Sequence, residues 1–130
     1  MGKEIVNTPK VHPYTPVIPV SLATKCGNLV FISGQLSRNE KGENVHVGDG
    51  VNQARQVFAN MKALIEAAGG TMEDICKMTV FLTDLSERPA IWKMVQEEVF
   101  HSNYPACSLV QVVALANPDW KVEVEAIAVI

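Results

Sequence analysis

Apolar and charged residues alternate most regularly at the end of the chain. In residues 121–130, KVEVEAIAVI, the even positions from 122 to 128 are apolar, whereas Lys121, Glu123 and Glu125 are charged. Successive side chains of a strand point to opposite faces, so this pattern predicts a strand with one buried face.

A second apolar run, Ser108–Ala114, precedes this strand and is also rich in β-branched residues. The turn-forming residues Asn117, Pro118 and Asp119 separate the two runs. Short β-branched runs on either side of a turn cluster are typical of paired strands. We therefore predict a C-terminal hairpin.

The N-terminal part of the chain predicts an extended arm and a first hairpin. Residues 7–20 contain four prolines, which disfavour a helix. The segments Ser21–Lys25 and Leu29–Leu36 then flank the turn residues Cys26, Gly27 and Asn28, as two paired strands would. We expect Leu29–Ile32, an unbroken apolar run, to be fully buried.

The middle of the chain has the apolar spacing of a helix. The segment Ser37–Gly50 is polar and is expected to be a loop, and Asp49 can cap a helix that begins at Val51. Apolar residues then recur at helical spacing until Gly69 and Gly70 end the pattern.

A strand and a second helix are expected after this helix. Thr71–Asp74 has the pattern of a capping box, and Lys77–Leu82 reads as a strand. Ser86 is the expected cap of the second helix, whose inner face would carry Ile91, Met94, Val95 and Val99.

The predicted order is β-β-α-β-α-β-β, an α+β fold in which residues 1–130 form one domain with two helices on one face of a mixed sheet. Ser33, Gln35, Glu123 and Glu125 would then lie on the face without helices. Another subunit would cover an open face in a chain this apolar, so we expect a homo-oligomer with sites between subunits.

Charge and cysteine content narrow the classes of function. The net charge of −3 provides no basic surface for a nucleic acid, and no apolar run reaches the roughly 18 residues that span a membrane. The three cysteines have no metal-ligand spacing, and the N-terminus lacks the apolar core of a secretory signal. We expect reduced thiols, a cytoplasmic protein, and no metal or cofactor.

Five segments carry a resemblance to a known family. They are Phe31–Gln35 (FISGQ), Asn52–Gly69, Thr79–Leu85 (TVFLTDL), Tyr104–Ala106 (YPA) and Val122–Ala128 (VEVEAIA). In this order they resemble the RidA/YjgF/YER057c/UK114 family of enamine/imine deaminases. The resemblance covers nearly the whole chain from about Leu29 onward.

The resemblance implies a chorismate-mutase-like fold and a homotrimer with three clefts between neighbouring subunits. In active members an arginine holds the substrate carboxylate, and a glutamate positions the water that hydrolyses the C=N bond. The glutamate matches Glu123, and the serine and glycine that complete the pocket match Ser33 and Gly34.

Three positions depart from the family pattern. The arginine is replaced by Cys107, because the family's P-A-R-S reads Pro-Ala-Cys-Ser here. The aromatic hydroxyl of the N-terminal arm would fall at Val20, with Tyr14 farther upstream. An asparagine on the second helix aligns with Trp92. A neutral thiol offers one weak donor where a guanidinium makes two charge-assisted bonds, so affinity for an α-imino acid should fall.

Alternatives remain open for each candidate residue. Cys107 is either a nucleophile or acid at the site or a neutral part of the pocket wall. Glu123 is either a general base or one of the charged residues on a solvent-exposed strand face. Trp92 is either a stacking platform or a core or interface residue. Arg38, Arg55 and Arg88 are all candidates to replace the missing cation.

Two functions are consistent with these residues. The first is hydrolysis of a C–N bond in a small enamine, imine or related substrate, in a cleft between subunits where Cys107 replaces the arginine. The alternative is a non-catalytic trimer that binds a small metabolite or regulates a partner. Ribonuclease activity, sometimes attributed to the family, is disfavoured by the acidic charge.

Overall fold

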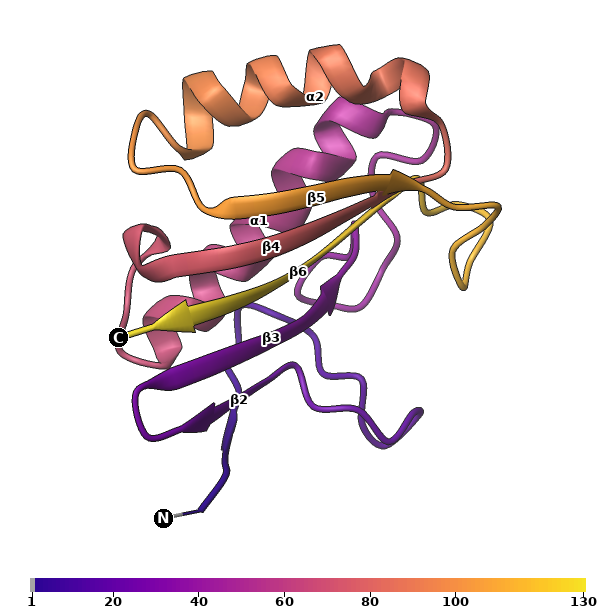
Figure 1. Cartoon of the computed structure of the whole chain (residues 1–130). Helices are drawn as coiled ribbons and strands as arrows, with labels where there is room; N and C mark the ends of the chain where they lie inside the picture. The colour runs from indigo at the N-terminus through magenta and orange to yellow at the C-terminus, as the bar shows by residue number, and fades with distance from the viewer. Residues whose placement is uncertain (1) are drawn as a thin grey trace.

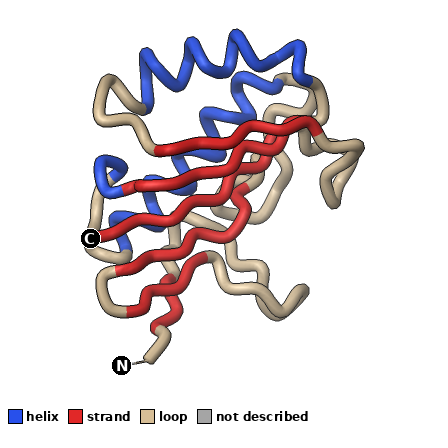
Figure 2. The backbone as a smooth tube through the Cα atoms, viewed as in Figure 1, coloured by secondary structure: helices blue, strands red, loops and turns tan. Residues whose placement is uncertain are grey.

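A computed structural model describes residues 2–130 as a six-stranded sheet with helices on one face (Figures 1 and 2). The strands are β1 (Glu4–Val6), β2 (Ala23–Cys26), β3 (Leu29–Gln35), β4 (Ile75–Leu82), β5 (Ala106–Gln111) and β6 (Val122–Val129). The helical elements are α1 (Gly50–Ala67), η1 (Met72–Asp74), η2 (Leu85–Glu87), α2 (Arg88–Met94) and η3 (Val95–Val99). The predicted α+β architecture is confirmed.

The order of strands across the sheet is β1-β2-β3-β6-β4-β5, and among the strand pairs of residues 2–130 only β4–β5 is parallel. The predicted hairpin of the two C-terminal strands is therefore wrong, because β4 lies between β5 and β6. α2 provides the long crossover that two parallel strands need, and it runs beside β5 in Figure 1. The segment 112–121 is long enough to carry the chain past β4 to the central position of β6.

The N-terminal hairpin is confirmed, with Cys26 opposite Leu29 across a turn in which Gly27 has a positive φ of 61°. One strand was not predicted. The three residues of β1 pair with β2 and form the edge of the sheet. Such a short strand has too few residues to show an alternating pattern.

The apolar run in β3 is not fully buried, contrary to the prediction. Val30 and Ile32 are 0% and 3% exposed, but Leu29 and Phe31 are 38% and 42% exposed. The helices cover only one face, so alternate residues of the run remain on the other. A bulge after Ile32 reverses the alternation and places Gln35, 1% exposed, on the helix side, so its predicted place on the open face is also wrong.

α1 begins and ends as the sequence predicts. The Asn52 amide donates to the Asp49 carboxylate at 3.1 Å, which caps the helix. After its end, Gly69 adopts a φ of 100° that favours glycine. The predicted capping box at Thr71 and Asp74 is present on η1.

The second helix begins differently from the prediction. Ser86 does not cap it; Asp84 caps η2 by accepting a hydrogen bond from the Ser86 amide at 2.9 Å, and η2 leads into α2. The predicted inner residues Ile91, Met94 and Val95 are buried, whereas Val99 is half-buried. The last turn, η3, is a π-helix.

The core lies between the sheet and the helices. The apolar even positions of β6 are buried as predicted, and they pack with residues of α1 such as Val57, Met61 and Leu64. The opposite face of the sheet is open and carries a group of exposed apolar side chains: Leu29, Phe31, Val110, Ile127 and Val129. No helix in the described part of the chain is long and apolar enough to cross a membrane.

Candidate functional site

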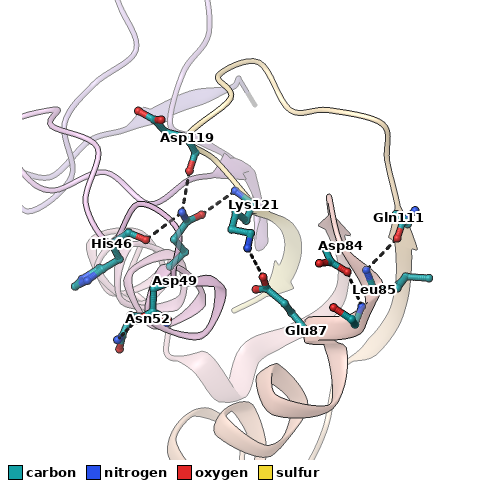
Figure 3. Close-up of polar contacts among 11 residues, drawn as sticks. His46, Asp49, Asn52, Asp84, Leu85, Glu87, Gln111, Asp119 and Lys121 are labelled. Atoms are coloured by element: carbon teal, nitrogen blue, oxygen red, sulfur yellow. Dashed lines mark hydrogen bonds and ion pairs between the residues drawn. The ribbon is translucent and has the colours of Figure 1, made fainter.

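A buried glutamine fixes the segment that leads into β6. The Gln53 amide group donates to the carbonyls of His46 at 3.2 Å and Asp119 at 2.8 Å. Its oxygen accepts from the Lys121 amide at 2.8 Å (Figure 3). Gln53 is 0% exposed, so the hydrogen bonds hold the backbone two residues before Glu123.

An ion pair extends this polar network toward α2. Lys121 pairs with Glu87, which raises the pKa of Lys121 (Figure 3). A methyl group at Gly50 would overlap the Glu87 carboxylate, so with a larger residue at this start of α1 the Glu87 side chain would have to shift. The Leu85 amide donates to the Gln111 side chain at 2.9 Å, which joins the end of β5 to η2.

Glu123 is half-buried on the open face of the sheet and contacts the bulge of β3. A Cβ at Gly34 would lie 2.7 Å from Cδ of Glu123, so a glycine is needed for the carboxyl group to approach the backbone. Burial raises the pKa of Glu123, and the nearby Glu125 raises it further. A carboxyl group with a raised pKa can act as a general base close to neutral pH.

Ser33 belongs to the same open face. Its hydroxyl donates to the Ser21 carbonyl at 2.7 Å, which fixes the side chain. It lines a depression of about 440 Å³, together with residues that include Thr24, Lys77, Thr79 and Glu125. The sequence-predicted Ser33, Gly34 and Glu123 are therefore gathered at neighbouring positions of β3 and β6.

Tyr14 reaches this group from the N-terminal arm of its own chain. Its hydroxyl donates to the Gly34 carbonyl at 2.6 Å, and the Arg38 guanidinium lies 5.2 Å from its ring centroid. Burial raises the pKa of Tyr14 to about 12; Arg38 opposes the shift and Glu123 adds to it. Val20 is 39% exposed. The arm thus brings Tyr14, rather than Val20, to Gly34.

The three arginines that could replace the missing cation have different environments in the structure. Arg55 is paired with Glu98 at 2.8 Å, and Arg88 is exposed at the start of α2. Arg38 is the one that stacks on Tyr14, and among residues 2–130 no carboxylate lies within ion-pair distance of it. Sequence spacing did not select Arg38, because its relation to Tyr14 depends on the path of the arm.

Cys107 faces the other side of the sheet. It is in register with the buried Met78 of β4, and it lines a pocket of about 300 Å³ beside α2 that also contains Trp92. Burial of the sulfur raises the pKa of Cys107, partly offset by Lys77, so the thiol is protonated at neutral pH. Within one protomer the structure does not bring Cys107 and Glu123 together.

All three cysteines, Cys26, Cys76 and Cys107, are exposed and unpaired. No group of three or more His, Cys, Asp or Glu in the described residues could hold a metal ion. The candidate site therefore consists of two parts, a polar group around Glu123 and an apolar pocket around Cys107.

Comparison with known sequences finds a matching family and relatives that align with this chain over nearly their whole length. The sequence model of one family, described as endoribonuclease L-PSP, matches residues 10–130. A 2-iminobutanoate/2-iminopropanoate deaminase of Dermatophagoides farinae is 38% identical, with 98% of this chain and 97% of the relative covered. A 3-aminoacrylate deaminase, RutC, of Acinetobacter baylyi is 37% identical, with 98% of each covered.

Solved structures with a similar fold also match this chain over nearly its whole length. RidA from the Antarctic bacterium Psychrobacter superposes with a TM-score of 0.88 at 38% identity, covering 98% of this chain and 99% of that one. TdcF of E. coli with bound serine gives a TM-score of 0.83 at 37% identity, covering 97% and 98%. The chain is thus similar over its whole length to proteins named as deaminases of small imines and enamines.

Proposed function

This chain belongs to the RidA/YjgF/YER057c/UK114 family, which includes the proteins described as endoribonuclease L-PSP, and we propose that it hydrolyses the C–N bond of a small enamine or imine. The observation that carries the proposal is the half-buried Glu123 beside Gly34, with a raised pKa. Relatives at 37–38% identity named as imine and aminoacrylate deaminases support the reaction class.

The proposed chemistry uses Glu123 as the general base. The oxygen of a water molecule attacks the carbon of the protonated C=N group, while Glu123 accepts a proton from that water. Protonated Glu123 then returns that proton to the nitrogen of the resulting tetrahedral adduct and ammonia leaves. The hydroxyl group of the adduct gives its proton to water as the carbon becomes a carbonyl. Ser33 and the backbone at Gly34 would orient the substrate, because Gly34 lies against the Glu123 carboxyl group and Ser33 precedes it on β3.

The proposed cleft lies between two subunits. Cys107 and Glu123 lie on opposite faces of one sheet, so a site that uses both must combine residues of different protomers. The exposed apolar side chains of the open face favour its burial in the expected homotrimer. The three unpaired cysteines are consistent with a cytoplasmic location.

The Cys107 half of the cleft would bind the end of the substrate that the family's arginine holds in active members. A protonated thiol cannot replace charge-assisted bonds that contribute about 1.5–3 kcal/mol each. We therefore expect weak affinity for a carboxylate at this position and a substrate that is neutral or differently charged.

Glu123→Gln tests the proposal, with Glu125→Gln as the matched control on the same strand face. A flavin amine oxidase acting on a primary amine would generate imines without a carboxylate in the assay, and ammonia release would be followed. Loss of the general base should reduce kcat by about 10²- to 10⁴-fold. Glu125 is exposed and is the smaller cause of the shift at Glu123, so Glu125→Gln should reduce kcat far less than Glu123→Gln. Equal activity of Glu123→Gln and the unaltered protein would refute the role of Glu123.

The second candidate is a non-catalytic trimer that binds a small metabolite. Two observations favour it: the neutral thiol at the arginine position, and the Tyr14 hydroxyl that already occupies the Gly34 carbonyl. Under this alternative the unaltered protein shows no ammonia release above that of Glu123→Gln. Sedimentation would check the homotrimer that both candidates share.

A further inference from the structure

The pocket beside α2 has a composition unlike that of the Glu123 group. Its volume is about 300 Å³, at the small end of the range for ligand sites. Aromatic and other apolar side chains form most of its wall: Met78, Trp92, Phe100, Tyr104 and Pro105, with Cys107 at the edge strand. The wall suits a small ligand with a flat apolar surface.

The polar groups of this pocket are few, and two already have partners. The Tyr104 hydroxyl donates to the His101 carbonyl at 3.1 Å, and the Cys107 thiol contacts the Ser108 carbonyl at 3.5 Å. Gln96 supplies a neutral amide. Lysine and arginine are absent from the residues that line the pocket. Lys77 acts on the Cys107 thiol from outside this lining. A carboxylate bound here would lose water without a cation in the lining to pair with, which is unfavourable.

The backbone is irregular at the wall of the pocket. The π-helical turn η3 begins at Val95, and the Phe100 amide donates to the Val95 carbonyl at 2.9 Å. Val95, Gln96 and Phe100 all line the pocket. π-Helical turns are frequent at functional sites, so the distortion of the helix is an observation independent of the side-chain composition.

We propose that this pocket binds an uncharged, planar apolar group of about the size of an indole or phenyl ring, stacked on Trp92, and that it rejects a carboxylate. The inference rests on the proposed function in one respect: the ring would be the side group of the substrate whose C–N bond is hydrolysed. Trp92 and Cys107 are then specificity-determining residues, and the ring takes the place that the resemblance assigns to a carboxylate.

Alkylation of Cys107 reports on occupancy of the pocket without any turnover. Cys26→Ser together with Cys76→Ser leaves Cys107 as the single thiol, and N-ethylmaleimide is an uncharged reagent for it. At ten times its Kd, indole should slow the alkylation of Cys107 about tenfold, because about nine tenths of the pockets are then filled. Benzoate, with a ring of similar size but a negative charge, should leave the rate unchanged.

Two controls on the same chain test the location. With Cys76 as the single thiol, indole should not slow alkylation, because Cys76 lies outside the pocket. Trp92→Ala should remove the protection of Cys107, whereas Trp92→Phe should keep most of it. If Trp92→Ala does not fold, replacement of the exposed Tyr104 by alanine, which removes another aromatic wall, should weaken the protection.

Two outcomes would overturn the proposal: indole fails to protect Cys107, or benzoate protects it equally well. These outcomes are distinguishable from failure of the proposed function. Protection by indole in a protein without deaminase activity leaves the pocket assignment intact and refutes only the enzyme. Activity that depends on Glu123, without protection by indole, supports the enzyme and refutes the ring-binding pocket.

Discussion

The two parts of the candidate site are held in place by different forces. At the Glu123 end, side chains and backbone are joined by directed contacts: the Tyr14 hydroxyl donates to the Gly34 carbonyl, and Gln53 is hydrogen-bonded to the segment before β6. Figure 3 shows the contacts of Asp119 and Lys121 in that segment. At the Cys107 end, apolar side chains of α2 and η3 pack against β5, with few polar contacts. The first part has a fixed geometry suited to moving a proton, and the second has a shape suited to recognition.

This difference predicts where the chain tolerates substitution. Hydrogen bonds depend on both partners, and a buried group that loses its partner is unfavourable. An apolar wall depends on volume and shape, so a replacement of similar size is tolerated. We therefore expect the Glu123 end to respond sharply to single changes, and the Cys107 end to change its ligand preference instead.

The largest expected effect on stability is that of Gln53→Leu. The change removes three hydrogen bonds and leaves the His46 and Asp119 carbonyls and the Lys121 amide without these partners. The free energy of unfolding should fall by about 2–4 kcal/mol, measured by urea denaturation. Gln96→Leu at the exposed rim of the pocket is the control and should change it by less than about 0.5 kcal/mol. Equal losses for both variants would contradict the comparison.

A smaller effect is expected for Cys107→Arg, which places a cation at the apolar end. A guanidinium forms charge-assisted bonds with a carboxylate, so kcat/KM for a carboxylate-bearing imine should rise about tenfold or more. Cys76→Arg, outside the pocket, should have no such effect. If Cys107→Arg gives no gain while Glu123-dependent activity remains, the Cys107 end does not contact that part of the substrate.

The smallest expected effect is on the pH dependence of stability. The pKa of Glu123 is raised in the folded chain, so between its unfolded and folded pKa values the folded state binds more protons. Stability should therefore fall as pH rises through that window. Glu123→Gln should remove this loss, so at pH values above the window the variant should have a slightly higher Tm than the unaltered protein. Glu125→Gln should reduce this loss only in part, because burial of Glu123 is the larger cause of the shift and Glu125 the smaller one. A Tm difference between Glu123→Gln and the unaltered protein that is independent of pH would contradict the shift.

The regular parts of the fold could be predicted from local pattern. The alternation in 121–130 and the helical spacing after Asp49 both depend on neighbours in sequence, and the structure confirms both. The pairing of β5 could not be predicted in this way. Whether β5 pairs with β4 or with β6 depends on how the chain crosses over through α2. The local alternation of apolar and polar residues does not reveal that path.

The candidate site was predicted only where it depends on adjacent residues. Ser33, Gly34 and Glu123 follow from two strand motifs, and they lie close together in the structure. The contact of Tyr14 with Arg38 and Gly34 depends on the path of a proline-rich arm with no period. The side of the sheet that Cys107 faces depends on its register with Met78, which the sequence of β5 alone does not determine.

The outer position of β5 has a consequence for newly synthesised chains. β5 has one neighbour in the sheet, and its six residues, ACSLVQ, include neither charge nor proline. The backbone N–H and C=O groups along its free side can template cross-β pairing between molecules, a hazard that natural edge strands commonly avoid with charge or proline. If the proposed homotrimer covers this side, prompt association of the subunits would protect the chain from amyloid-like aggregation, and the proposed assembly would serve proteostasis as well as recognition.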